Sequence, residues 1–192
     1  MAAADLPTLA FETEAAWHDW LERNHAVSPG VWIRFAKKAS GEASITHDEA
    51  LDAAIAYGWI DGQNKSLGAT HYVQRFIPRA PRSKWSRING SKAEALIASG
   101  QMRPAGLREV ERAKADGRWA AAYEGPRLIP VPDDLREALD ASPRAAAFFE
   151  GLDSKNRYAV LYRIHDAKKP ETRARRIANF VGMLAEGRKL HP

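Results

Sequence analysis

Apolar and polar residues alternate along short segments in the first half of the chain. The segment 31–37 follows a Pro-Gly turn and places its apolar residues on one side, which predicts a strand. The runs 59–65 and 70–78 predict two further strands, joined by a turn around Leu67 and Gly68. We expect these three segments to form a small antiparallel sheet.

Elsewhere the apolar residues recur every three or four positions, which is typical of amphipathic helices. Thr13 is a predicted N-cap, and Thr46 with Glu49 forms a predicted capping box at the start of a second helix. Ser91 and Glu94 repeat this pattern, so we expect a third helix to begin there. The remaining predicted helices span 103–117, 132–142, 142–152 and 154–168, with a last one from about residue 170.

The order of these elements predicts an α+β fold: a small antiparallel sheet with helices, followed by an all-helical C-terminal region. Residues 123–132 contain three prolines and a glycine, which is typical of a linker. We therefore expect two domains, an α+β domain at 1–125 and a helical domain at 126–192. A chain of 192 residues is long enough for two small domains with their own cores.

The composition excludes several classes of protein. No apolar run approaches the roughly 20 residues that cross a bilayer, and the N-terminal segment lacks the pattern of a signal peptide. The absence of cysteine excludes disulfides, thiolate metal sites and a cysteine nucleophile. The histidines show no helical metal-ligand spacing, and no phosphate-binding or dinucleotide-binding glycine motif occurs. We expect a cytoplasmic protein without a metal or a cofactor.

Positive charge is concentrated in two segments. The net charge is +5, yet residues 71–92 alone hold six Lys or Arg and no Asp or Glu. Residues 163–189 hold eight basic and three acidic residues. Because a local positive field attracts anions of any kind, nucleic acid, phosphorylated metabolites and acidic proteins all remain open as partners.

The segment 79–87 is the strongest candidate for a ligand site. Pro78 and Pro81 stiffen it, which lowers the entropic cost of holding its arginines in place. Arginine matches phosphate or carboxylate bidentately, serine hydroxyls add donors, and tryptophan offers a stacking face. The expected ligand-binding residues are Trp59, Asp61, Arg79, Arg82, Ser83, Trp85 and Ser86. The structural alternative is that Asp61 pairs with one of these arginines and that the tryptophans belong to the core.

Two other hypotheses stay open. A nucleic-acid-binding protein would use the basic residues of both charged segments to contact phosphates. These residues are Arg75, Lys84, Arg87, Lys92, Arg173 and Arg176. An enzyme would have to use Asp61 or His71 as its acid or base.

Several blocks of the sequence resemble the bacterial YdeI/OmpD-associated family. They include SPGVWIRFAKKASG, YGWIDGQNK, FIPRAPRSKWSRIN and AKKPETRARRIANFVGMLAEG, and the similarity runs from about Trp17 to Gly187. The resemblance implies a stress-related protein linked to protection against bacteriocins or antimicrobial peptides, with a porin partner suggested by the family name. It implies no reaction, cofactor or catalytic residue. Members often carry a cysteine shortly before the GWID turn, where this chain has Ala56, so no thiol role is implied here.

Overall fold

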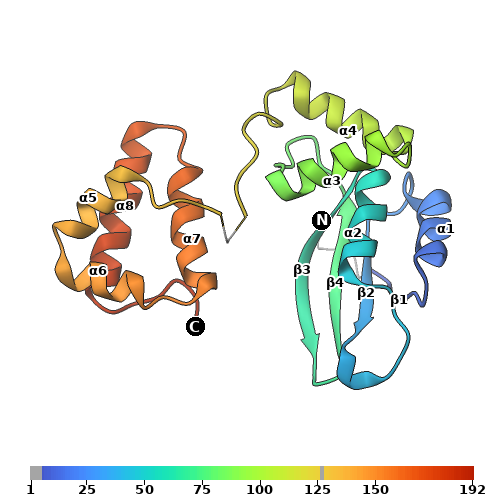
Figure 1. The fold of residues 1–192 in the computed structure, drawn as a ribbon, viewed down its shortest axis with the longest axis horizontal. Helices are drawn as coiled ribbons and strands as arrows, with labels where there is room; N and C mark the ends of the chain where they lie inside the picture. Colours follow the sequence, from blue (N-terminus) through green and yellow to red (C-terminus); the bar gives the residue numbers. More distant parts are fainter. Residues whose placement is uncertain (1–5, 126–127) are drawn as a thin grey trace. The chain divides into compact units, whose positions relative to one another are not determined.

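The computed structural model describes residues 6–125 and 128–192. The chain divides between Ala122 and Tyr123 into two compact units (Figure 1). Residues 126 and 127 of the predicted linker lie outside the described residues, and the predicted domain boundary falls on them. Each unit is built around apolar clusters of its own, two in the first unit and one in the second, so each unit is described by itself.

A four-stranded sheet forms the centre of the first unit. Its strands are β1 (Thr8–Ala10), β2 (Val31–Ala36), β3 (Trp59–Leu67) and β4 (His71–Pro78), in the order β1-β2-β4-β3. The pairs β2–β4 and β3–β4 are antiparallel, as predicted, whereas β1 runs parallel to β2 and makes the sheet mixed. Three residues are too few to show a period, which explains why the sequence did not predict β1.

One face of the sheet packs against two helices, α1 (Glu14–Asn24) and α2 (His47–Ala56). Both start as predicted: Thr13 caps α1, and Thr46 forms a complete capping box at α2. The indole of Trp17 donates a hydrogen bond to the Ala50 carbonyl at 3.1 Å, which fixes α1 against α2. A short 3-10 helix, Lys38–Ser40, follows β2.

Helices α3 (Arg87–Ala98) and α4 (Pro104–Ala115) complete the first unit. The predicted start of α3 at Ser91 is wrong. The hydroxyl of Ser86 accepts a hydrogen bond from the Asn89 backbone N–H, so the helix begins five residues earlier. The true cap lacks an acidic residue at its third helical position, and the sequence pattern therefore favoured the later serine.

Helix α4 approaches α2 closely at Gly106. A Cβ atom at this position would lie 2.3 Å from the Ala56 carbonyl oxygen and 2.6 Å from that of Ile55. Only glycine fits such a contact. The approach places α4 beside the end of β4, where the basic loop, residues 79–86, begins (Figure 1).

The second unit is a bundle of four helices, which confirms the predicted all-helical region. They are α5 (Asp133–Asp140), α6 (Pro143–Glu150), α7 (Ser154–His165) and α8 (Pro170–Ala185). The largest fully buried side chains of its core are Leu135, Leu161, Ile164 and Leu184. Within the described part of the chain, no helix has the length and apolar character needed to cross a membrane.

Candidate functional site

The loop between β4 and α3, residues 79–86, is held by arginine side chains that bind its backbone. Arg79 is only 6% exposed, and its guanidinium lies 3.6 Å from the centroid of the Trp85 ring. Its Nη1 donates to the Lys84 carbonyl at 3.2 Å. Arg79 therefore stabilises the loop from within through a cation–π contact and a carbonyl contact.

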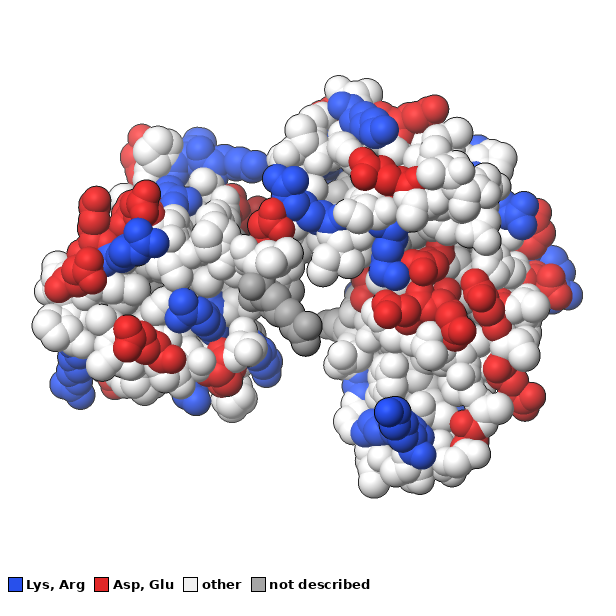
Figure 2. All heavy atoms as spheres, viewed as in Figure 1, with Lys and Arg blue, Asp and Glu red and all other residues white. Residues whose placement is uncertain are grey.

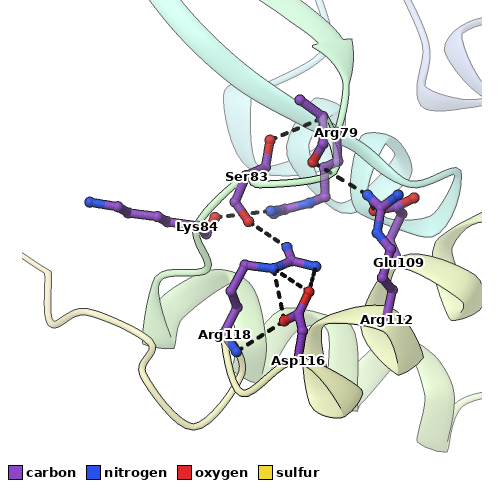
Figure 3. Close-up of polar contacts among 8 residues, drawn as sticks. Arg79, Ser83, Lys84, Glu109, Arg112, Asp116 and Arg118 are labelled. Atoms are coloured by element: carbon purple, nitrogen blue, oxygen red, sulfur yellow. Dashed lines mark hydrogen bonds and ion pairs between the residues drawn. The ribbon is translucent and has the colours of Figure 1, made fainter.

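Two arginines from the α4 region hold the same loop (Figure 3). Arg112 donates to the Ala80 carbonyl at 3.3 Å, and Arg118 donates to the Ser83 carbonyl at 2.7 Å. Each of these arginines also binds a carboxylate: Glu109 pairs with Arg112, and Asp116 pairs with Arg118.

The loop also closes on itself. The Ser83 backbone N–H donates to the Ala80 carbonyl, and the Ser83 hydroxyl accepts from the Ala80 N–H at 3.0 Å. Pro78 precedes this turn and Pro81 lies within it, and both lack an N–H donor. Because its carbonyls bind buried or half-buried arginines, the loop is a rigid support for its outward side chains.

The predicted stacking residues, Trp59 and Trp85, lie in different clusters and are each 1% exposed. Trp59 packs against Trp17 and Trp20, and its indole donates to the His25 carbonyl. The Trp85 ring packs between Arg79 and Trp119. The structure therefore does not bring the two predicted rings together.

Asp61 lies at the start of β3 in contact with His47 and Gln74. Its carboxylate is 3.3 Å from His47 Nε2 and 3.3 Å from Gln74 Nε2. The Gln74 amide is buried and also donates to the Gly62 carbonyl. The histidine partner lies 14 positions before Asp61, too far along the chain for a local pattern to predict the contact. His71 belongs to a separate contact, 3.1 Å from Glu42.

The remaining residues of the predicted site differ in exposure. Arg82 and Lys84 are exposed on the rigid loop, and Ser83 is half-buried. The Ser86 hydroxyl serves as the cap of α3. The outward cations of this region are thus Arg82, Lys84 and Arg87, all from the segment that the sequence singled out.

A small cavity of about 140 Å³ opens beside the loop. Trp85 and Trp119 line it together with Arg87, Gly90 and Ser91 of α3, and Glu94 adds a carboxylate. The Trp85 Nε1–H is buried and has no hydrogen-bond partner among the described residues. Since a buried donor without a partner is destabilising, this atom needs an acceptor that the described residues do not supply.

Both parts of the chain match the models of known protein families. Residues 9–109, just over half of the chain, match the model of a domain of unknown function, DUF8412. Residues 129–187 match the model of the OmdA family, described as bacteriocin-protection, YdeI or OmpD-associated. The chain belongs to the DUF8412 family and carries an OmdA domain. No curated protein and no solved structure matches the chain significantly.

The predicted resemblance to the YdeI/OmpD-associated family is therefore confirmed, and the matched model covers the helical bundle. Two residues of the nucleic-acid hypothesis lie in this OmdA domain. Arg173 binds Asp134 through two hydrogen bonds of 2.5 and 2.8 Å. These bonds are the main reason that the pKa of the Asp134 carboxyl lies below its ordinary value. Arg176 donates to the Arg163 carbonyl.

The other residues of that hypothesis lie in the DUF8412 part. Acidic side chains gather over α2 on the face shown in Figure 2, and Lys92 binds two of them, Asp52 at 2.7 Å and Asp48 at 3.5 Å. Burial alone would lower the pKa of the Lys92 ammonium, but these two carboxylates raise it overall. Arg75 pairs in register with Trp32, on the sheet face opposite α1 and α2.

Within residues 6–125 and 128–192, no three His, Asp or Glu side chains cluster as metal ligands.

Proposed function

We propose that the protein binds a small phosphorylated ligand with hydroxyl groups, such as a sugar phosphate, beside the basic loop of residues 79–86. The observation that carries this proposal is the buried Trp85 Nε1–H, which lacks a hydrogen-bond partner among the described residues and belongs to a residue that lines a cavity. We infer that a small rearrangement of the lining side chains lets a phosphate or hydroxyl oxygen in the cavity accept this hydrogen bond. The donor would then be satisfied.

The other lining groups fit the same ligand. Arg87 supplies a guanidinium suited to phosphate, and Ser91 supplies a hydroxyl. The Glu94 carboxylate accepts hydrogen bonds from ligand hydroxyls, which favours a sugar phosphate over inorganic phosphate. Arg82 adds to the positive field from the rigid loop. We assign Trp59 and Asp61 to the packing of the first unit.

The test is calorimetric titration of the full chain with glucose 6-phosphate, glucose and inorganic phosphate. Wild-type protein is expected to bind the sugar phosphate best. Arg87→Ala is expected to weaken binding by roughly 10- to 100-fold, because it removes a charged hydrogen bond. Arg82→Ala is expected to weaken it about two- to threefold through the field alone.

Arg108→Ala is the matched control, since Arg108 is an exposed arginine of α4 outside the cavity lining. This variant is expected to bind like the wild type. Equal losses in Arg87→Ala and Arg108→Ala would refute the site and leave only a general charge effect. Binding that disappears at moderate salt for every anion would refute it as well.

A second candidate, nucleic-acid binding, is favoured by the sheet face opposite α1 and α2. Trp32 lies there with Lys65, whose ammonium is 4.5 Å from the ring centroid, and with Arg34 and Arg75. Aromatic rings flanked by cations are typical of surfaces that stack single-stranded bases. Affinity for a short oligonucleotide would fall steeply with salt and drop in Trp32→Ala. A flat salt response would exclude this candidate.

The OmdA domain supports a further proposal at the level of the cell, a role in bacteriocin protection under stress, exerted in the cytoplasm. We expect cells that lack the protein to be more sensitive to a bacteriocin. Wild-type protein should restore survival and Arg87→Ala should not. Full rescue by Arg87→Ala would separate protection from the proposed ligand site.

A further inference from the structure

Helix α7 of the OmdA domain has two differently used faces. Val160, Leu161 and Ile164 are buried in the helical core. Lys155, Tyr158 and Tyr162 recur at the spacing of a second helical face, and they line an open cavity of about 590 Å³. A volume of several hundred cubic ångström is typical of small-molecule sites.

One wall of this cavity is fastened to α7 by a buried asparagine. Asn156 is 1% exposed and exchanges two hydrogen bonds with the backbone of His191: the His191 N–H donates to Asn156 Oδ1 at 2.9 Å, and Asn156 Nδ2 donates to the His191 carbonyl at 3.2 Å. The same amide donates to Asp153, the cap of α7. The segment at His191, which lines the cavity, is therefore held in place by directional contacts.

The lining combines aromatic rings with positive charge. The rings of Tyr158 and Tyr162 lie 5.7 Å apart between centroids. Lys155 and Arg163 supply cations, and no Asp or Glu is among the described residues of the lining. Arg163 donates through Nη1 to the Ala159 carbonyl, which uses one of the five N–H donors of a guanidinium.

Tyr158 contributes a hydroxyl that stays protonated. Burial, followed by the neighbouring phenols of Tyr123 and Tyr162, raises its pKa to about 12. At neutral pH it is therefore a hydrogen-bond donor, in this structure to the Glu124 carbonyl at 3.5 Å, and not a phenolate. An anion in the cavity meets no negative charge from this side chain.

We propose that this cavity of the OmdA domain binds a small aromatic carboxylate. The tyrosine rings offer stacking faces for an aromatic ring, and Lys155 with Arg163 provides the charge complement of one carboxylate. A neutral ring lacks the ionic contact, and a short aliphatic acid lacks the stacking. This site lies in the second unit and is independent of the proposed function of the basic loop.

The test is a titration of the isotope-labelled full chain with 3-phenylpropionate, 3-phenylpropionamide and propionate, followed by amide chemical shifts. We expect saturable shifts between Ser154 and Arg163 with phenylpropionate, and affinity about tenfold weaker for the amide and for propionate. Lys155→Ala is expected to weaken phenylpropionate binding about three- to tenfold. Lys155 is exposed, so this variant should fold normally.

Arg144→Ala is the matched control, because Arg144 is an exposed cation of α6 that does not line the cavity. Unchanged binding in this variant, with a loss in Lys155→Ala, would support the site. Equal affinity for acid and amide would overturn the proposal. So would equal losses in the two variants, or shifts that spread over the molecule without saturating.

Discussion

Replacing Gly106 by alanine tests the closest helix contact of the first unit. The added Cβ would lie 2.3 and 2.6 Å from two carbonyl oxygens of α2, so α4 must move away from α2 by roughly 1 Å to restore ordinary contact distances. Overpacking of this kind costs about 1–3 kcal/mol. The upper end applies because both overlapped atoms belong to the backbone. Against this, alanine favours a helix by about 1 kcal/mol over glycine. We expect a net destabilisation of about 2 kcal/mol.

Gly90→Ala is the matched control in the same unit. Its Cβ would lie 3.7 Å from Trp119, an ordinary contact, so only the gain in helix propensity remains. We expect this variant to be about 0.5–1 kcal/mol more stable than the wild type. Replacing glycine by alanine should therefore destabilise the first unit at Gly106 and stabilise it at Gly90.

Urea unfolding monitored by tryptophan fluorescence measures both effects. All six tryptophans of the chain lie before residue 123, so the fluorescence reports on the first unit alone. With a slope of about 2 kcal/mol per molar urea, Gly106→Ala should lower the midpoint by about 1 M. A Gly106→Ala variant as stable as Gly90→Ala would refute the close approach of α2 and α4.

Three further predictions concern caps and titrating groups. Ser86→Ala should lower the free energy of unfolding of the first unit by about 1 kcal/mol, while Ser91→Ala should leave it nearly unchanged. A larger loss in Ser91→Ala than in Ser86→Ala would show that the helix begins at Ser91. Arg173 lowers the pKa of Asp134 in the folded chain, so this carboxylate stabilises the fold above its unfolded pKa of about 4, and the contribution is lost as the pH falls below that value. Asp134→Asn should therefore make the loss of helical circular dichroism at acid pH less steep than in the wild type. An identical pH dependence in the two proteins would contradict the pairing. In Tyr158→Phe, the phenol that ionises near pH 12 should disappear from a spectrophotometric titration, and its persistence would assign that pKa to another tyrosine.

Local signals predicted much of the fold. The caps at Thr13 and Thr46 depend on residues three positions away, and the structure confirms both. The alternation in β2 likewise predicted which side chains face the core. The start of α3 could not be predicted in this way, because Ser86 and Ser91 both suit a cap and tertiary packing decided between them.

The sequence by itself determined where positive charge is concentrated, that the chain combines a small sheet with a helical region, and that its tail resembles the OmdA family. The tertiary structure alone decided what each charged residue does. Arg79 and Arg82 are three positions apart, yet the first is buried on Trp85 and the second is exposed. Their roles differ because the Arg79 guanidinium lies on the Trp85 ring, and that ring is held by Trp119, some 30 residues later in the chain. The cavity between α7 and His191 is likewise a product of packing between distant segments, which no local pattern encodes.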